Sequence, residues 1–254
     1  MLLQDKRIVI TGGAGGIGRA MARHFLEHGA RLLLTDLKDE ALEDAAGALG
    51  HEDRVFTVAA DVTGSEDNRR IVEAAREHLG GIDVFCANAG VEGVVKPLTE
   101  YPEDTWDLVQ AVNVKGVWLG LKYAFPVMAE GGGGSVIVTS SVAGLQGNAQ
   151  MSAYTTSKHA VIGLARTAAI EGAPHGIRVN CINPGPVDNR MMRALESGMN
   201  ADDPESVKEG FSQMIPLGRY AEEDDVARAA LYFASDLSAY VTGTVHPVDG
   251  GLSA

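Results

Sequence analysis

The chain has 254 residues, with 21 lysines and arginines against 34 aspartates and glutamates, and a formal net charge of -13 at pH 7. This negative charge argues against nucleic acids and anionic membranes as partners. The length suits one α/β domain over residues 1–254. A strand predicted from Arg7 leaves no room for a signal peptide, and no apolar run approaches a membrane span. We therefore expect a cytoplasmic protein.

The segment from Arg7 to Asp36 predicts a strand, a turn, a helix and a second strand. The apolar run at 8–10 is typical of a strand buried on both faces. The string TGGAGGIG at 11–18 interrupts it, and apolar residues then recur every four positions, as on a helix packed against a sheet. Gly29 suits the left-handed end of this helix. The whole unit has the size of one βαβ crossover, about 30 residues.

The glycines of this turn predict a dinucleotide site. A pyrophosphate can rest on the free N–H groups of a helix N-terminus only where no Cβ blocks its approach. Gly12 then permits the tight turn, Gly16 the close approach of the backbone, and Gly18 the packing of helix on strand. Asp36 follows Gly18 by eighteen residues and is placed to bind an adenosine ribose. The spacing is TGxxxGxG rather than GxGxxG, and the glycines alone would also fit a turn without a ligand.

Strands and helices keep alternating beyond Asp36, without a linker or a repeat. We predict strands at 55–58, 82–87, 135–139, 177–182 and 243–248, and helices at about 65–79, 102–129, 154–171 and 225–235. Pro126 should kink or end the second of these helices. Residues 186–222 are predicted to be irregular and to form a mobile flap over the substrate. The alternation predicts an α/β fold with a single Rossmann-type, doubly wound parallel sheet and helices on both faces.

Cysteine and histidine positions do not predict a metal site. Cys86 and Cys181 fall in predicted strands and are expected to be buried free thiols. The string from His24 to His28 matches HxxEH, the pattern of one class of zinc peptidase, but it lies away from the strand ends and lacks a third acidic ligand. Trp106 and Trp118 lie on the long helix, where we expect packing or subunit contacts rather than base stacking.

A second motif follows the fifth predicted strand. Tyr154 and Lys158 stand four residues apart and so share one face of a helix. Such pairs are common on surfaces, but Ser141 precedes this one at the C-terminal end of a strand, where open α/β sheets bind ligands. At this point the chain resembles the short-chain dehydrogenase/reductase family over essentially its whole length. The matching motifs are TGGAGGIG at 11–18, Asp61-Val62, Asn88-Ala89-Gly90, Asn113, Ser141, Tyr154 with Lys158, Pro184-Gly185 and Val248-Asp249-Gly250-Gly251.

The resemblance implies an oxidoreductase that transfers a hydride between NAD(H) and a neutral secondary alcohol or ketone, cyclic ones included. Tyr154 would be the acid/base, and the Lys158 ammonium would lower its pKa from the free value of about 10. Ser141 would hold the substrate oxygen. Asn113 would support a water chain from Lys158 to solvent; without the resemblance, a solvated helix residue would be the preferred interpretation.

The resemblance also implies cofactor contacts along the whole chain. They are Gly12, Gly15, Gly16, Ile17 and Gly18 in the turn, Asp36 and Leu37 after the second strand, Asp61 and Val62 at the adenine, Asn88, Ala89 and Gly90 on the adenosine side, Tyr154 and Lys158 at the nicotinamide ribose, and Pro184, Gly185, Val187 and Asn189 along the nicotinamide. Two positions depart from the family pattern. Ala87 replaces a usual asparagine, which should affect strand packing rather than chemistry. Asn189 replaces a common threonine, and we expect cofactor binding to survive because asparagine still forms hydrogen bonds.

The charge of Asp36 favours NAD over NADP, because a 2′-phosphate would meet its carboxylate. Family members that prefer NADP often carry Arg or Lys just before the second motif glycine, where this chain has Gly15. Lys38 is the nearby cation, and a solvated position at a helix start explains it as well. The cofactor is therefore predicted to be NAD.

The substrate side is expected to be apolar with a few hydrogen-bonding groups, which suits a neutral substrate. Its predicted lining is Ser141, Gln146, Gln150 and Met151 from the loop after the fifth strand, with Met191 and Met192 from the flap. Methionine suits a surface that reshapes around a ligand, although sealing of the core is an equal alternative for any one of them. The resemblance further implies a homotetramer, in which the helix at 112–123 and the helix after Tyr154 pack against symmetry mates.

Two other functions share these motifs. An NADPH-dependent 3-oxoacyl-carrier-protein reductase is the first, and Asp36 and the acidic surface argue against it, since an acidic carrier needs basic residues around the cleft. A non-catalytic dinucleotide sensor is the second, and it would tolerate loss of the set Asn113, Ser141, Tyr154 and Lys158.

Overall fold

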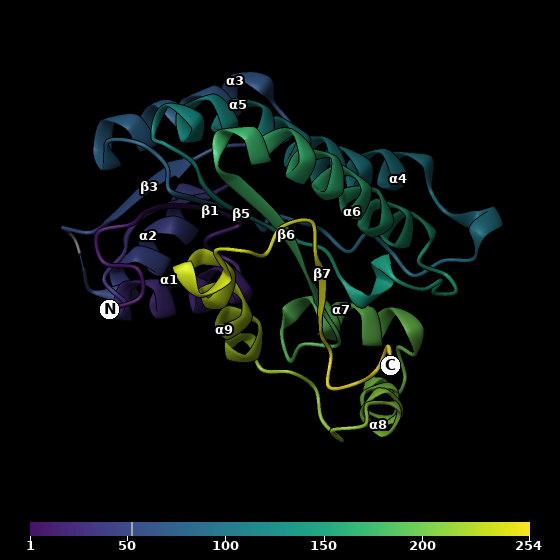
Figure 1. Cartoon of the computed structure of the whole chain (residues 1–254). Coiled ribbons are helices and arrows are strands. Elements are labelled where there is room, and N and C mark those ends of the chain that lie inside the picture. Colours follow the sequence, from purple (N-terminus) through teal and green to yellow (C-terminus); the bar gives the residue numbers. More distant parts are fainter. Residues whose placement is uncertain (52) are drawn as a thin grey trace.

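A computed structural model describes residues 1–51 and 53–254, in which seven parallel strands form one sheet of order β3-β2-β1-β4-β5-β6-β7 (Figure 1). The strands are β1 (Arg7–Thr11), β2 (Arg31–Asp36), β3 (Val55–Ala59), β4 (Val84–Ala87), β5 (Gly134–Thr139), β6 (Ile177–Pro184) and β7 (Val245–Val248). The chain winds outward from β1 in both directions, so the strand order reverses between β1 and β4. This is the predicted doubly wound Rossmann-type sheet.

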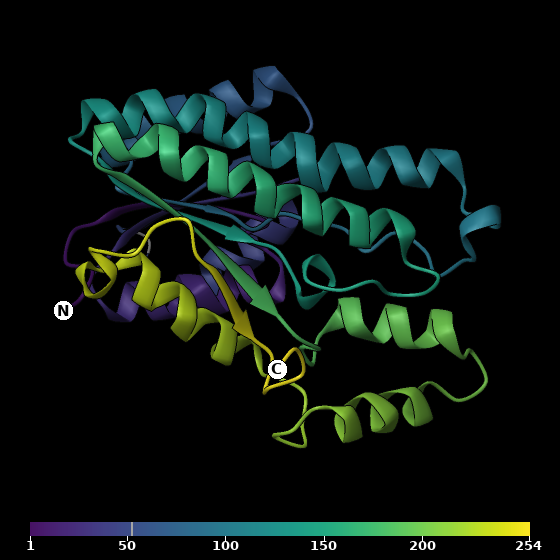
Figure 2. The ribbon, with the colours of Figure 1, turned by 45° about the vertical axis from the view of Figure 1, so that its right-hand side comes forward.

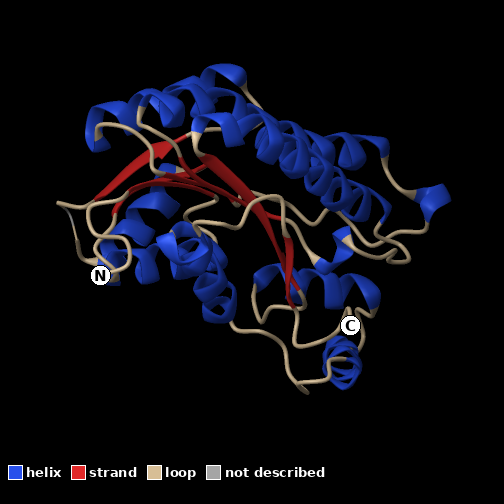
Figure 3. Ribbon diagram, viewed as in Figure 1, coloured by secondary structure: helices blue, strands red, loops and turns tan. Residues whose placement is uncertain are grey.

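Helices cover both faces of the sheet (Figure 3). One layer contains α1 (Gly16–Glu27), α2 (Asp39–Leu49) and α9 (Glu223–Ala234), and the other α3 (Ser65–Ala74), α5 (Val117–Glu130) and α6 (Ser152–Gly172). The apolar side chains of each central strand pack against both helix layers. In β1, Val9 packs on the side of α5 and α6, whereas Ile8 and Ile10 pack on the side of α1 and α9. This two-sided burial explains why the central strands are apolar at every position. Within residues 1–51 and 53–254, no helix is both long and apolar enough to cross a bilayer.

The long helix predicted at 102–129 consists of three joined segments. They are α4 (Glu103–Gln110), a π-helical segment at Ala111–Gly116, and α5. α5 continues through Pro126 to Glu130, so this proline does not end the helix. Burial of Val127 and Met128 in the core holds the last turn in place and outweighs the hydrogen bond lost at the proline. β6 likewise runs two residues past its predicted end, because Asn183 and Pro184 pair with β7 at the sheet edge.

The flap segment, residues 186–222, is not irregular as predicted but contains α7 (Arg190–Met199) and α8 (Pro204–Met214). Asn189 caps α7 by accepting a hydrogen bond from the Met192 N–H at 3.1 Å. Asp203 caps α8 in the same way, accepting from the Ser206 N–H at 3.1 Å, and Pro204 occupies the first helical position. These side chains satisfy the first backbone donors of each helix. Figure 2 shows α7 and α8 stacked beyond the carboxyl ends of β6 and β7.

Motion of the flap segment stays a prediction, which limited proteolysis can test. The link between α7 and α8, residues 200–203, is exposed and should be cut readily. NAD plus substrate should slow cleavage between residues 186 and 213, because closure over a ligand restricts the backbone. Mass spectrometry of the fragments locates each cut, and cleavage elsewhere in the chain serves as the control. Equal cleavage rates with and without ligands would mean that the segment is fixed structure.

Candidate active site

The glycine-rich turn joins β1 to α1 beside the point where the strand order reverses. Gly12 has φ +66° and passes so close to the residues after β4 that a Cβ would stand 2.9 Å from the Ala89 Cα. Gly18 lies under the turn, where a Cβ would overlap the Gly12 carbonyl oxygen. α1 begins at Gly16 without a capping side chain on Gly15, which leaves the N–H groups of its first turn for an anion. The turn therefore has the shape and the donors that a pyrophosphate requires.

Asp36 lies at the end of β2, next to this turn. One of its carboxylate oxygens accepts a hydrogen bond from the Ala14 N–H at 3.1 Å, and the other accepts from the Leu37 N–H at 2.8 Å. The carboxylate is thus fixed beside the glycine-rich turn. Leu37 is 64% exposed beside it and offers an apolar surface for a base.

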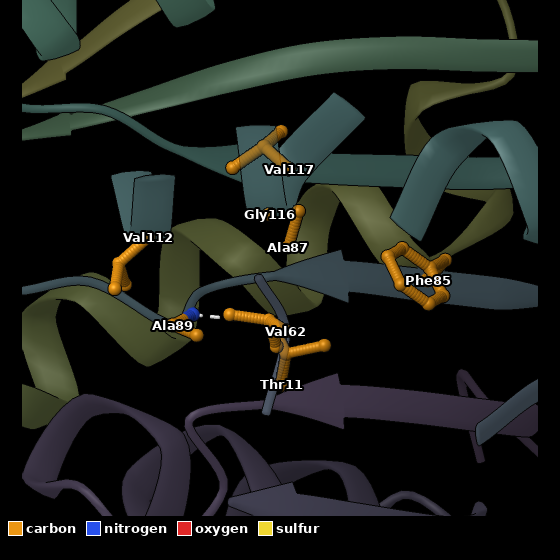
Figure 4. Close-up of a pocket in the computed structure, with 8 residues that line it drawn as sticks. All are labelled: Thr11, Val62, Phe85, Ala87, Ala89, Val112, Gly116 and Val117. Atoms are coloured by element: carbon orange, nitrogen blue, oxygen red, sulfur yellow. Dashed lines mark hydrogen bonds between the residues drawn. The ribbon is translucent and has the colours of Figure 1, made fainter. Parts of the chain in front are cut away.

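The predicted adenosine side is built from the ends of β1 and β4 and from the residues after β3. Thr11 Oγ1 accepts a hydrogen bond from the Asn88 N–H at 3.0 Å. It accepts a second one from the Ala89 N–H at 3.1 Å (Figure 4). Asp61 is exposed, and Val62 shares with Ala89 the lining of a cavity of about 10 Å³. This volume holds about one water molecule. It belongs to the packing behind the adenosine side and not to a substrate site.

Asn88 connects three strand ends. Its amide donates to the Thr11 and Gly12 carbonyl oxygens at 3.2 and 3.3 Å, and its Oδ1 accepts from Thr139 Oγ1 at 3.1 Å. Thr139, at the end of β5, also accepts a hydrogen bond from Lys158 Nζ through its carbonyl oxygen at 2.9 Å. Thr139 thereby links the turn to Lys158. The sequence analysis missed it, because nothing in its local pattern separates it from other strand residues.

Ser141, Tyr154 and Lys158 come together at the carboxyl end of β5. Ser141 caps the short 3₁₀ turn at 142–144 by accepting from the Ala143 N–H at 3.1 Å, which fixes the position of its hydroxyl. Tyr154 and Lys158 lie one turn apart near the start of α6, and both side chains are buried. The Lys158 ammonium stands 5.4 Å from the centre of the Tyr154 ring. These are three of the four residues predicted as a catalytic set.

We expected the pKa of Tyr154 to be lowered, but the surrounding residues of the chain raise it. Burial raises the pKa of Tyr154 to about 12, and the nearby Glu92 carboxylate adds to this, whereas the Ser141 hydroxyl opposes it. Lys158 Nζ donates its hydrogen bond to the Thr139 carbonyl oxygen and stands 5.4 Å from the centre of the Tyr154 ring. Burial also lowers the pKa of Lys158 to about 8. The phenol is therefore protonated at neutral pH and ready to act as an acid.

Asn113 is 1% exposed and lies in the π-helical segment between α4 and α5, so the alternative of a solvated surface residue is wrong. Its Oδ1 accepts from the Val91 N–H at 2.8 Å, and its Nδ2 donates to the Val91 carbonyl oxygen at 2.9 Å and to Ser157 Oγ at 3.0 Å. Asn113 thus holds the residue after Gly90 against α6. Gly90 itself lies close by, where a Cβ would stand 3.5 Å from Lys158 Nζ. Single π-helical turns are frequent at functional sites.

The end of β6 carries the residues predicted along the nicotinamide. The Pro184 carbonyl oxygen accepts from Ser141 Oγ at 3.4 Å, and the Gly185 N–H donates to the Val248 carbonyl oxygen at 3.0 Å. Val187 is buried and pairs with Ala221, so much of its side chain belongs to the core. The Asn189 oxygen is engaged as the cap of α7.

An apolar cluster surrounds Tyr154 on the predicted substrate side. It contains Ala143, Met151, Tyr154 and Leu195, with Val95, Met191 and Met192 packed against it. Met191 Sδ lies 4.0 Å from the Tyr154 hydroxyl oxygen. Gln146 and Gln150 are exposed at the rim, and Met199 and Met214 are exposed on α7 and α8.

A bidentate ion pair that the sequence analysis did not foresee joins α7 to the loop after β4. The Arg190 guanidinium donates to the two carboxylate oxygens of Glu92 at 2.9 and 3.2 Å. The neighbouring Glu92 charge contributes to the raised pKa of Tyr154. In contrast, no three His, Cys, Asp or Glu side chains converge as a metal site in the part of the chain that the structure describes. Cys86 and Cys181 are both buried free thiols, as predicted.

A glycine-rich turn at a helix start, a carboxylate at the end of the next strand and a tyrosine–lysine pair at the carboxyl edge of one parallel sheet are the arrangement expected of a nicotinamide-dinucleotide-dependent oxidoreductase with a Rossmann-type fold. A family model described as "Enoyl-(Acyl carrier protein) reductase" matches residues 12–253. The chain belongs to the short-chain dehydrogenase/reductase family. The resemblance drawn from its motifs is thereby confirmed.

Two curated relatives and two solved structures illustrate the likeness. Levodione reductase from Leifsonia aquatica is 37% identical over 253 residues, covering 98% of this chain and 95% of that protein. Momilactone A synthase from Oryza sativa subsp. japonica is 40% identical over 252 residues, covering 99% of this chain and 91% of that protein. The crystal structure of levodione reductase has a TM-score of 0.95 at 36% identity and covers 98% of both chains. NAD+-bound xylitol dehydrogenase has a TM-score of 0.94 at 31% identity, covering 99% of this chain and 100% of that one.

These similarities extend over 98–99% of the chain. The protein is an enzyme that acts on CH–OH groups, interconverts secondary alcohols and ketones, and uses a nicotinamide dinucleotide cofactor.

Proposed function

We propose that the protein is a cytoplasmic, homotetrameric, NAD-dependent dehydrogenase/reductase of a neutral secondary alcohol or ketone, cyclic substrates included. The observation that carries this proposal is the meeting of Ser141, Tyr154 and Lys158 at the carboxyl edge of the sheet, beside an apolar cluster. When bound, the nicotinamide ring supplies or accepts the hydride. Ser141 then holds the substrate oxygen, and the Tyr154 hydroxyl gives it a proton during reduction or removes one during oxidation.

Lys158 serves this proton transfer through its charge. With a pKa of about 8 it is largely cationic at neutral pH, and in the proposed mechanism its charge, 5.4 Å from the ring centre, offsets part of the cost of forming the phenolate without outweighing the burial that raises the pKa of Tyr154. Asn113 holds the Val91 backbone and Ser157 in place around the lysine. In the proposed mechanism the proton is replenished from solvent by a water chain that passes Lys158 and Asn113.

The lining of the substrate side supports a neutral substrate. Met151, Met191 and Leu195 are apolar, and the charge of Arg190 is already matched by Glu92. A phosphorylated or carboxylate substrate would need an unmatched cation.

A direct test supplies a panel of cyclic and linear secondary alcohols with either NAD or NADP. The absorbance of the reduced nicotinamide then measures turnover. Turnover of neutral alcohols with NAD is the expected result. Turnover of acyl-carrier substrates with NADPH alone would favour the carrier reductase, and cofactor binding without turnover of any alcohol or ketone would favour the sensor.

Asp36→Ala should weaken the binding of NAD and reduce the discrimination against NADP. The variant removes the proposed ribose acceptor, the charge that repels a 2′-phosphate, and the hydrogen bond to the Ala14 N–H. We expect the NAD-to-NADP ratio of kcat/KM to fall by about tenfold or more, the equivalent of one hydrogen bond to a charged group. Asp39→Ala, which removes an equal charge from the exposed first turn of α2, is the control and should leave the ratio unchanged. A wild-type preference for NADP would show that the charge argument is wrong.

The proposed tetramer places α5 and α6 against symmetry mates. Trp118 is 45% exposed on α5, whereas Val117 and Leu121, also expected at this contact, are buried in the core. On α6, Gly163 is exposed, and a Cβ there would meet nothing within 4 Å, so this face has room for a closely packed helix. Sedimentation at low micromolar concentration should show a species near four times 26.7 kDa. A stable monomer at that concentration would refute the assembly.

A further inference from the structure

Glu223, the first residue of α9, lies against the start of α1. A Cβ built on Gly16 would overlap the Glu223 carboxylate, and even the more distant oxygen, Oε2, would lie only 2.9 Å from that Cβ. The sequence analysis attributed the lack of a side chain at Gly16 to the approach of a pyrophosphate. In the structure the same space borders a carboxylate that comes from the opposite end of the chain.

The charge of Glu223 is not balanced by a close partner. On α1, Arg23 pairs with Asp224, and His24 Nε2 lies 3.4 Å from Asp224. Arg219, in the segment before α9, pairs with Asp225 at 2.8 Å. Within the described part of the chain, Glu223 itself takes part in no ion pair and accepts no hydrogen bond through its carboxylate.

The surroundings of Glu223 are mostly acidic. Burial raises its pKa, and the carboxylates of Asp224 on α9 and of Glu222, the residue before the helix, raise it further. Arg19 on α1 lowers it, and Asp188 in the loop after β6 raises it slightly. Asp188 in turn pairs with Arg193 and Lys208 of the flap segment. Glu223 therefore lies against the α1 terminus, and its charge interacts with that of Asp188 in the loop after β6.

We propose that Glu223 sets the affinity for the cofactor and the rate of its release: its carboxylate disfavours the pyrophosphate at the α1 terminus and keeps the affinity for the dinucleotide low. This inference rests on the proposed NAD-dependent function. A pyrophosphate carries two negative charges, and the α1 terminus offers it backbone N–H groups and a positive dipole end. A third negative charge within a few ångströms opposes this attraction. Weaker binding speeds the departure of the product cofactor, a step that limits turnover in many enzymes.

The inference predicts a specific dependence on pH. The raised pKa means that Glu223 takes up its proton at a higher pH than an ordinary glutamate, and the neutral form no longer repels the pyrophosphate. The wild type should therefore bind NADH more tightly as the pH falls toward this raised pKa. Because Glu223→Gln is neutral throughout, its affinity should change much less over the same range.

Isothermal titration of NADH into the wild type, Glu223→Gln and Glu222→Gln tests the proposal without relying on turnover. Glu223→Gln should bind NADH about tenfold more tightly at pH 8, and stopped-flow displacement should show slower release. Glu222→Gln is the matched control, because the substitution removes the same charge one residue away. The Glu222 side chain is exposed and is directed to the backbone of α9, which it caps. The Glu222→Gln variant should stay within about twofold of the wild type, since an exposed charge is screened by solvent.

Three outcomes would overturn the proposal: unchanged affinity in Glu223→Gln, weaker affinity in Glu223→Gln, or an equal gain in Glu222→Gln. Glu223→Asp withdraws the same charge by one methylene group and should fall between the wild type and the glutamine variant. This second variant keeps the test valid if the glutamine variant is unstable. A wild type that binds no NADH would instead refute the proposed function, and the two failures are therefore distinguishable.

Discussion

Tyr154→Phe should lower turnover by about 10²- to 10⁴-fold while the affinity for NADH stays close to that of the wild type. The substitution removes only the hydroxyl, which is the group proposed to exchange a proton with the substrate oxygen. The ring is buried against Met151 and Leu195, and these contacts persist in phenylalanine. Steady-state rates in both directions, together with NADH titration, measure the two effects separately.

The matched control is Tyr232→Phe, which removes a hydroxyl from α9, away from the apolar cluster around Tyr154. Its turnover should stay within about twofold of the wild type, as for most surface substitutions. If Tyr154→Phe kept more than about a tenth of the wild-type turnover, general acid–base catalysis by this residue would be excluded.

The fold was predictable because the signals are local and repeated. Central strands such as Ile8–Ile10 are apolar on both faces, and the helices between them carry apolar stripes. The site was predictable because parallel strands end at one edge, so residues that follow strands, such as Ser141 and Asn88, gather there.

The two helices of the flap segment were missed although their signals are present. Asp203 followed by Pro204 is a typical helix start, and Met191, Met192 and Leu195 share one helical face. The richness of the segment in methionine and acids obscured these signals. Its apolar face packs against the cluster at Tyr154, and that partner is known only once the fold is built.

Other features depend on contacts between distant parts of the chain. The pKa of Tyr154 is raised by burial beneath residues of three separate segments, whereas motif spacing suggested only the neighbouring lysine. Glu223 and Gly16 come from opposite ends of the sequence, and only the packing of α9 on α1 brings them together. Local pattern carries no information on such pairs.

Gly18→Ala should destabilise the fold by about 1–3 kcal/mol and lower the affinity for NADH by an order of magnitude or more. The new Cβ would overlap the Gly12 carbonyl oxygen and stand 3.0 Å from the Gly13 Cα. Both neighbours are backbone atoms and cannot rotate away as a side chain would. The glycine-rich turn must therefore shift from the start of α1, which moves the donors that a pyrophosphate needs.

Gly47→Ala is the matched control for this substitution, because it makes the same chemical change in an open place. Gly47 is exposed within α2, and a Cβ there would meet nothing within 4 Å. Alanine favours a helix over glycine by about 0.8–1 kcal/mol, so this variant should be more stable than the wild type and bind NADH normally. Urea denaturation gives both stabilities, and titration gives both affinities. A Gly18→Ala variant as stable as Gly47→Ala, with unchanged NADH affinity, would mean that the turn tolerates a side chain and that close packing at Gly18 is not what shapes the site.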